Sequence, residues 1–244
     1  MSGRRIFIGD VQGCAATLEA LLARCGAVRG ADRLHFVGDL ARRGPSSAEV
    51  LALARDWEAR CVLGNHEALL LERGILEGRG TDPEAPDLAK DPRSPRFAAW
   101  IRDWPLARLI DGSILLVHAA VPPAFWKARR PADLAPLLAH PLPEPDRAWD
   151  EIQSFALTAR YCDPAGRRPR TDFPPPPPPF EAWFEFYEGA FTVVFGHWAR
   201  RGLVVREGLR GLDTGCVYGG RLSAWIAEED RIVQVPRAPV DEPG

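Results

Sequence analysis

The sequence has almost no lysine, no closely paired cysteines and no long apolar run. Only Lys90 and Lys127 are lysine, and every other basic residue is arginine, a bias that we attribute to genome composition. No stretch approaches the ~20 apolar residues that a membrane helix needs. The start shows no signal-peptide pattern, because it runs directly into an expected strand. We therefore expect a cytoplasmic protein without a membrane partner.

The five cysteines are odd in number and scattered, with no CxxC pair, which excludes a disulfide framework and a thiolate zinc motif. A net charge of −2 argues against broad binding to nucleic acids or anionic membranes. With 46% hydrophobic and 26% charged residues, the 244-residue composition is ordinary for a globular protein. We expect one domain over residues 1–244, and no protein partner is evident from the sequence.

The first seventy residues alternate between strand and helix patterns. Strands are expected at 6–8, 34–37 and 61–63, and helices at 15–25, 46–59 and from residue 66. Such alternation is typical of parallel strands joined by right-handed crossovers.

The rest of the chain is less regular. We expect a loop at 78–95, a helix at 97–104 and a hairpin over 106–117 that turns at Asp111-Gly112. Within the proline-rich stretch 122–180, six consecutive prolines at 174–179 predict a stiff polyproline connector, with an SH3-type ligand as the alternative. The end returns to strands, of which we expect the last four to form an antiparallel set: 203–206, 208–212, 222–227 and 231–236.

Five short polar stretches each follow an expected strand, and they supply the candidate metal ligands. The carboxyl ends of strands in an α/β protein meet where ligand sites assemble. Alone, each residue is more often a turn former, a helix cap or a core histidine, and we assign no function to His35 or His140. The ordered set favours a two-metal phosphoesterase, because its mixed oxygen and nitrogen donors suit Mn²⁺, Fe or Zn²⁺. The stretches are Gly9-Asp10-Val11-Gln12-Gly13, Gly38-Asp39-Leu40, Gly64-Asn65-His66-Glu67, Val117-His118-Ala119 and Gly196-His197-Trp198.

The spacing of these residues suggests how two metals would be shared. Asp10 and Gln12 stand two apart and can reach one ion, whereas Asp39 can bridge two ions with its two oxygens. The second ion would be completed by Asn65, His118 and His197. Two such metals polarise a phosphate and lower the pKa of a bridging water toward ~7. His66 can then donate a proton to the leaving group.

This order of motifs resembles the calcineurin-like metallophosphoesterases. Residues 38–45, 195–199 and 212–220 further resemble the symmetrical bis(5′-nucleosyl)-tetraphosphatases, or diadenosine tetraphosphate hydrolases. The resemblance runs from Ile6 to about Val235 and is weak between 78 and 155. It implies a four-layer α/β/β/α sandwich of two mixed sheets, with a dimetal centre at the strand ends. It also implies hydrolysis of diadenosine tetraphosphate and related dinucleoside polyphosphates to two nucleoside diphosphates by a hydroxide activated at two metals.

The resemblance also implies roles for individual residues. Two divalent cations are expected, Mn²⁺ first, with Co²⁺, Fe or Zn²⁺ as alternatives. The expected catalytic residues are His66, Asp39 and Arg43. The first metal would be held by Asp10, Gln12 and Asp39, and the second by Asp39, Asn65, His118 and His197. Residues expected to contact phosphate are Arg42, Arg43 and Arg160, with a surface arginine as the alternative for Arg160. From their side chains alone, Trp198, Tyr218 and Phe180 can stack on a nucleobase, and the alternative is that they pack the core or the pocket rim.

Two departures from the family pattern keep alternatives open. Gln12 stands where the superfamily has histidine, so the first site would load poorly or prefer Mn²⁺. Arg42 stands where protein phosphatases have the aspartate that orients the histidine of GNHE, which leaves the partner of His66 unassigned. The alternatives are a phosphoesterase for nucleotide-capped RNA 5′ ends or phosphoproteins, and a non-catalytic nucleotide-binding protein with a weakened first metal site.

Overall fold

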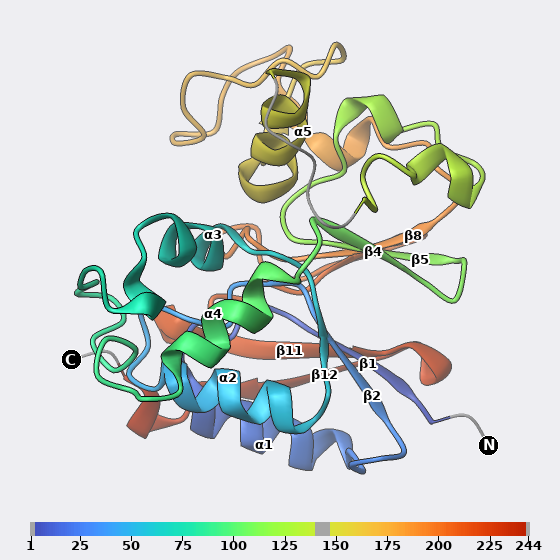
Figure 1. Ribbon diagram of the computed structural model, residues 1–244. Coiled ribbons are helices and arrows are strands. Elements are labelled where there is room, and N and C mark those ends of the chain that lie inside the picture. Colours follow the sequence, from blue (N-terminus) through green and yellow to red (C-terminus); the bar gives the residue numbers. More distant parts are fainter. Residues whose placement is uncertain (1–2, 140–146, 243–244) are drawn as a thin grey trace.

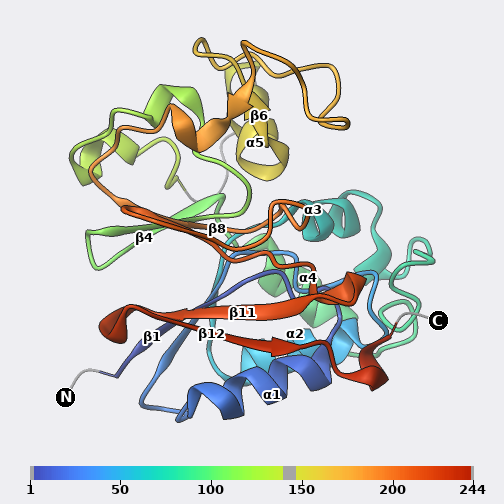
Figure 2. The ribbon, with the colours of Figure 1, turned by 180° about the vertical axis from the view of Figure 1, so that it is seen from behind.

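Two five-stranded mixed sheets stack face to face, and helices cover their outer faces (Figures 1 and 2). This computed structural model describes residues 3–139 and 147–242, so His140 lies outside the described residues. The arrangement is the four-layer α/β/β/α sandwich, so that expectation is confirmed.

The first sheet has the strand order β12-β11-β1-β2-β3. Strands β1 (Arg5–Ile8), β2 (Arg33–Phe36) and β3 (Arg60–Cys61) are parallel, and the crossover helices α1 (Ala15–Cys25) and α2 (Ser47–Asp56) lie on the outer face (Figure 1). The predicted strand and helix alternation is therefore correct.

The second sheet has the order β4-β5-β8-β10-β9. The predicted hairpin pairs β4 (Ala107–Ile110) with β5 (Ile114–Val117), and its turn places Asp111 and Gly112 at φ 48° and 71°. Strand β5 is parallel to β8 (Thr192–Phe195), and β8 is parallel to β10 (Leu209–Gly211). Helix α5 (Arg147–Thr158) covers this sheet from outside (Figure 1).

Alternating side chains along the strands divide the core into layers, because successive side chains of a strand point to opposite faces. Ile6 and Ile8 pack toward the helices, whereas Phe7 between them packs toward the other sheet. His35 lies opposite Phe7 in the register of β1 and β2 and stacks on its ring, with centroids 4.7 Å apart. The layer between the sheets contains Phe7, Val37, Val62, Ile110, Ile114, Leu116, Val194, Leu212 and Trp225.

The last four strands do not form one antiparallel set, so that expectation is wrong. Strand β9 (Val204–Arg206) pairs with β10 in the second sheet, whereas β11 (Arg221–Ile226) and β12 (Arg231–Pro236) pair in the first. The chain crosses between the sheets after β10. A Cβ at Gly9 would lie 2.3 Å from the carbonyl oxygen of Leu212, so glycine is needed where the crossing chain meets the end of β1.

The remaining elements frame the strand ends. Helix α3 (Asn65–Glu72) follows β3, and α4 (Ser94–Arg102) begins three residues earlier than expected. The proline run 174–179 connects β6 (Tyr161–Cys162) to its partner β7 (Glu181–Ala182). All five cysteines are buried and free. In the described ranges no helix has the length and apolarity to cross a membrane.

Candidate active site

The predicted ligands come together where the strands of both sheets end. Asp10 follows β1, Asp39 follows β2, and Asn65 opens α3 just after β3. His118 and His197 follow β5 and β8, which are parallel neighbours in the second sheet. Each carboxyl end therefore faces the same edge of the sandwich, which is why residues nearly two hundred positions apart share one site.

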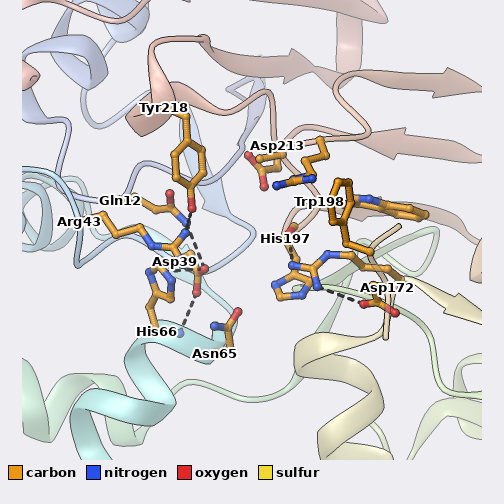
Figure 3. A pocket seen from close by; sticks show the side chains of 14 residues that line it. Gln12, Asp39, Arg43, Asn65, His66, Asp172, His197, Trp198, Asp213 and Tyr218 are labelled. Carbon is orange, nitrogen blue, oxygen red and sulfur yellow. Dashed lines mark hydrogen bonds and ion pairs between the residues drawn. The ribbon is translucent and has the colours of Figure 1, made fainter. Parts of the chain in front are cut away.

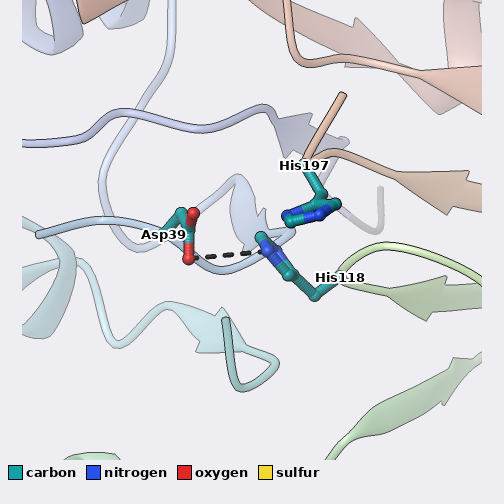
Figure 4. Close-up of side chains that lie close together, drawn as sticks. All are labelled: Asp39, His118 and His197. Carbon is teal, nitrogen blue, oxygen red and sulfur yellow. Dashed lines mark ion pairs between the residues drawn. The ribbon is translucent and has the colours of Figure 1, made fainter. Parts of the chain in front are cut away.

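Asp39, His118 and His197 form the most compact ligand cluster, shown in Figure 4. Their potential ligand atoms all lie within 4.8 Å of one another. Nε2 of His197 is buried and has no hydrogen-bond partner. An unpaired buried imidazole nitrogen is costly unless something outside the protein binds it, and a metal ion meets that need.

The hydrogen bonds of His118 also fit a metal ligand. Its Nδ1 donates to the carbonyl oxygen of Val37 at 2.8 Å, which leaves the lone pair of the neutral ring on Nε2. That nitrogen lies 3.0 Å from Oδ1 of Asn65 and 3.5 Å from Oδ1 of Asp39. Three acceptor atoms that converge in this way repel one another unless a cation lies among them.

Asp10 and Gln12, the residues expected to hold the first metal together with Asp39, contact the other candidate ligands directly. Both oxygens of Asp10 accept the backbone N–H of His197 at 3.1 Å, and the amide nitrogen Nε2 of Gln12 donates to Oδ2 of Asp39 at 3.4 Å. Burial and the charges of Asp213 and Asp39 raise the pKa of Asp10 well above its ordinary value. A divalent cation would relieve this crowding of carboxylates, so the donor set fits the metal that the sequence predicts.

Close backbone approach explains two of the glycines in these motifs. A Cβ at Gly196 would lie 2.0 Å from Oδ1 of Asp10, and one at Gly64 would lie 2.3 Å from Oδ1 of Asp39. Both distances are far below any contact that a real side chain makes. The glycines therefore let one loop lie directly against the carboxylate of another.

Glu67, which the sequence analysis left without a role, holds the Asp39 turn. Its Oε2 accepts the backbone N–H of Asp39 at 2.8 Å, and its Oε1 accepts those of Leu40 and Ala41 at 2.9 and 3.0 Å. Asp39 has φ of 50°, a left-handed conformation that is unfavourable for aspartate. The three bonds stabilise that conformation. The glutamate of Gly-Asn-His-Glu was a signal for this role, although its partners lie far away in the sequence.

The partner of His66, which the sequence analysis left unassigned, is a backbone carbonyl group. Its Nδ1 donates to the carbonyl oxygen of Ala41 at 3.0 Å, so no orienting aspartate is needed at position 42. Nδ1 also lies 3.6 Å from Oδ2 of Asp39. Burial lowers the pKa of His66, and the charge of Asp39 opposes that shift.

Arg42 lies away from the pocket, unlike its neighbour Arg43. Its guanidinium is buried and paired with Asp82 at 2.8 Å and Glu84 at 2.6 Å. The expected positive charge for a polyphosphate is thus neutralised, and the residue fastens the 78–93 loop to the Asp39 turn. Arg43 faces the pocket and donates to the hydroxyl of Tyr218.

Figure 3 shows the pocket above the candidate metal cluster, a cavity of ≈ 300 Å³. Asn65, His66 and His197 line it together with Gln12 and Asp39. Asp10 and His118 are not part of the lining. The other lining residues are Arg43, Arg160, Asp172, Phe173, Trp198, Ala199, Arg200, Asp213 and Tyr218.

The predicted substrate-contacting residues differ in their surroundings. Arg160 pairs with Asp172 at 3.2 Å and donates to the carbonyl oxygen of His197 at 3.3 Å. Trp198 lines the pocket but is only 7% exposed, because its ring packs on Tyr161 and Phe184. Tyr218 is 61% exposed. Phe180 does not line the pocket.

Comparison with known proteins decides the family. A sequence profile of the calcineurin-like phosphoesterases matches residues 3–201. The chain belongs to the calcineurin-like phosphoesterase family.

Individual members of this family that resemble the chain over nearly its whole length share one description. The chain is 34% identical to "Bis(5'-nucleosyl)-tetraphosphatase, symmetrical" of Aromatoleum aromaticum, over 93% of this chain and 95% of the relative. It is 33% identical to the protein of the same name from Methylobacillus flagellatus, over 96% and 95%. The crystal structure of a candidate diadenosine tetraphosphatase superposes with a TM-score of 0.74 at 31% identity, covering 98% of this chain and 96% of that one.

A yeast protein serine/threonine phosphatase shares the fold at 18% identity and a TM-score of 0.60.

Within this phosphoesterase fold, Asp213 is a further acidic residue that the sequence analysis missed. It lies on the chain that crosses between the sheets, and it accepts the backbone N–H of Gly215 at 3.0 Å. Burial and the charge of Asp39 raise its pKa to about 6, although the Gly215 bond opposes the shift. The motif Leu212-Asp213-Thr214-Gly215 was a signal, but only the crossing shows that Asp213 reaches the Asp10 and Asp39 side of the pocket.

Proposed function

We propose that this protein hydrolyses diadenosine tetraphosphate and related dinucleoside polyphosphates symmetrically, releasing two nucleoside diphosphates. The observation that carries the proposal is one pocket in which a metal-type ligand cluster adjoins three arginines and two exposed aromatic rings. Arginines match phosphate oxygens, and aromatic rings match nucleobases. The named relatives support the same substrate class.

Two divalent cations would be held by the residues already described. Asp10, Gln12 and Asp39 would hold one, and Asp39, Asn65, His118 and His197 the other. When bound, such ions polarise a phosphate and lower the pKa of water enough to make it a nucleophile at neutral pH. We propose Mn²⁺ as the preferred ion, with Co²⁺, Fe or Zn²⁺ as alternatives, because the ligand set mixes oxygen and imidazole donors.

The chain's own residues would orient the polyphosphate and move the proton. Arg43 and Arg160 line the pocket and can bind phosphate oxygens through two nitrogens each. His66 would protonate the leaving group, with Ala41 fixing the orientation of its ring. Gln12 would contribute a neutral carbonyl oxygen, so the first ion would bind more weakly than the second.

The proposal includes a single domain over residues 1–244 that acts in the cytoplasm without a protein partner. The reduced state of the five buried cysteines is compatible with that compartment. Nucleotide-capped RNA 5′ ends are a second candidate substrate, because a cap is chemically a dinucleoside polyphosphate with one long substituent. Because Asp82 neutralises the charge of Arg42, this residue does not help to choose between a polyphosphate and a phosphoprotein substrate.

Product analysis tests the proposal most directly. Purified protein with Mn²⁺ and diadenosine tetraphosphate should give ADP as the only nucleotide product on ion-exchange chromatography. Equal amounts of ATP and AMP would show asymmetric cleavage. Absence of any cleavage, together with tight binding of the nucleotide, would favour the non-catalytic alternative. Chelator-treated protein is the control for metal dependence.

A further inference from the structure

Two aromatic side chains at the pocket stand out by their exposure. Phe173 is 63% exposed and Tyr218 is 61% exposed, and both line the candidate active site. Among residues 3–139 and 150–242, whose exposure the structure describes, they are the only exposed phenylalanine, tyrosine or tryptophan side chains, and the other exposed large hydrophobic residues are aliphatic. Exposing an aromatic ring to water is unfavourable, so finding both at one polar pocket points to a ligand with flat apolar faces.

Each exposed ring is accompanied by an arginine. The guanidinium of Arg43 lies 5.3 Å from the ring centroid of Tyr218, and that of Arg200 lies 4.0 Å from that of Phe173. All four residues line the pocket. Each pair therefore combines a π-face for a base with a positive charge for an adjacent phosphate.

The two pairs come from different segments of the pocket wall: Arg43 follows Asp39 by four residues, whereas Phe173 follows Asp172, the partner of Arg160. In Figure 3, Tyr218 and Arg43 are on one side, and Asp172 and Trp198 are on the other, with Asp39 and His197 between them. Phe173 directly follows Asp172 in the chain, and Arg200 follows Trp198 by two residues. A ligand that contacts both pairs would therefore lie in the pocket that Asp39 and His197 also line.

Phe173 is held by contacts on both sides of its backbone. Asp172 pairs with Arg160 at 3.2 Å, and Arg160 also binds the backbone of His197. The hydroxyl of Thr171 donates to the carbonyl oxygen of Phe173 at 2.9 Å and accepts its N–H at 3.2 Å. The six prolines then begin, and their rings restrict the backbone. The proline run thus supports an exposed ring at the edge of the pocket.

We propose that Phe173 and Arg200 form a nucleobase site distinct from the one formed by Tyr218 and Arg43. The two sites would bind the two bases of a symmetrical dinucleotide while its polyphosphate lies across the metal centre. This inference rests on the proposed function, and it assigns the second nucleoside to the segment that precedes the proline run.

The test compares a substrate that has two bases with one that has a single base. Steady-state kinetics would be measured on diadenosine tetraphosphate and on adenosine 5′-tetraphosphate for the wild type, Phe173→Ala, Phe173→Trp and Phe180→Ala. We expect Phe173→Ala to lower kcat/KM for diadenosine tetraphosphate roughly tenfold, mainly by raising KM, since base stacking binds ground and transition states alike. The single-base substrate can use the Tyr218 site, so its kcat/KM should fall much less. Phe173→Trp should restore the preference for two bases.

The control and the contrary outcomes are distinct. Phe180→Ala removes a phenyl ring at the other end of the same proline run, outside the pocket, and should leave the ratio of the two kcat/KM values unchanged. If Phe173→Ala weakens both substrates equally, the ring has a structural role and the inference fails. It also fails if neither substrate is affected. If the wild type cleaves neither substrate, the proposed function fails first.

Discussion

The floor and the rim of the pocket are built in different ways. The floor consists of Asp39, Asn65 and His197 in the lining, backed by Asp10 and His118, which bond to them. All five stand at strand ends and are buried or half-buried. The rim consists of Arg43, Phe173, Arg200 and Tyr218, which come from loops and short turns. The comparison teaches that the chemistry depends on the rigid sandwich, whereas substrate choice depends on loops that can vary without disturbing it.

Constrained backbone occurs in the floor and in the rim, since Gln12 and Arg43 also have positive φ, 48° and 67°. Asp39 and His197 both have positive φ, 50° and 65°, although neither is glycine. Each is held by a carboxylate that accepts its backbone N–H: Glu67 for Asp39, and Asp10 for His197. Such strain persists only where surrounding contacts enforce it, which is typical of a functional site.

The largest effect should follow a change at the centre of the floor. Asp39→Asn keeps the shape of the side chain but removes the charge that would bridge two cations. We expect turnover of diadenosine tetraphosphate to fall below about one per cent of wild type, because both metals are needed to activate water and polarise phosphate. Metal content by mass spectrometry should fall as well. An Asp39→Asn protein with two bound metals and near-normal turnover would contradict the bridging role.

Replacing His66, which lies next to the candidate ligand Asn65, should distinguish a role in proton transfer from a role in metal binding. His66→Asn should lower kcat by roughly 10²–10⁴-fold while both metals stay bound, because His66 would act as a general acid and is not a ligand. His118→Asn should lower metal content together with rate. Metal stoichiometry measured beside kcat decides the matter, and metal loss in His66→Asn would make His66 a ligand or a structural residue.

Variants of the adjacent residues Arg42 and Arg43 should distinguish a residue that binds substrate from one that stabilises the fold. Arg43→Ala should lower kcat/KM roughly 10- to 100-fold with little change in stability, since it loses charged hydrogen bonds to phosphate. Arg42→Met should instead cost about 3 kcal/mol of unfolding free energy, because Asp82 stays buried without its main partner. Urea unfolding and steady-state kinetics on both variants provide the check. Equal kinetic losses would place Arg42 in the substrate site.

The smallest effect concerns His35, which does not line the pocket. Burial, aided by the charge of Arg60, lowers its pKa to about 3, and neither ring nitrogen has a hydrogen-bond partner. Its ordinary pKa is 6.5, so between pH 6.5 and 3 the unfolded chain binds a proton that the folded chain rejects. Stability must therefore fall as the pH drops through this window.

Replacing His35 removes that dependence. When the pH falls from 7.5 to 5.5, His35 should lower the unfolding free energy of the wild type by about 1.4 kcal/mol. The His35→Leu protein should not show this loss. Urea unfolding of both proteins at the two pH values measures the difference. Identical pH slopes would show that His35 keeps its ordinary pKa, and activity at pH 7.5 is the control for an intact floor.

Much of the floor could be predicted from the sequence because its signals are local. Each ligand directly follows an apolar strand, and parallel strands place their ends at one edge. The rim was harder to predict. Tyr218 and Arg43, which we expect to contact substrate, line the pocket. Arg42, expected to do the same, does not line it, because it pairs with Asp82 and Glu84 some forty residues away. Nothing in the pattern near Phe173 indicated a pocket.

The sequence by itself determined the order of strands and ligands, since strand periodicity and the residues after each strand are properties of short segments. Only the tertiary structure decided three other features: the bond from His66 to Ala41, the crossing of the chain between sheets after β10, and the position of Phe173 at the pocket. These depend on which distant segments pack together. That choice is set by burial and hydrogen bonding summed over the whole fold, and a local pattern carries no information about it.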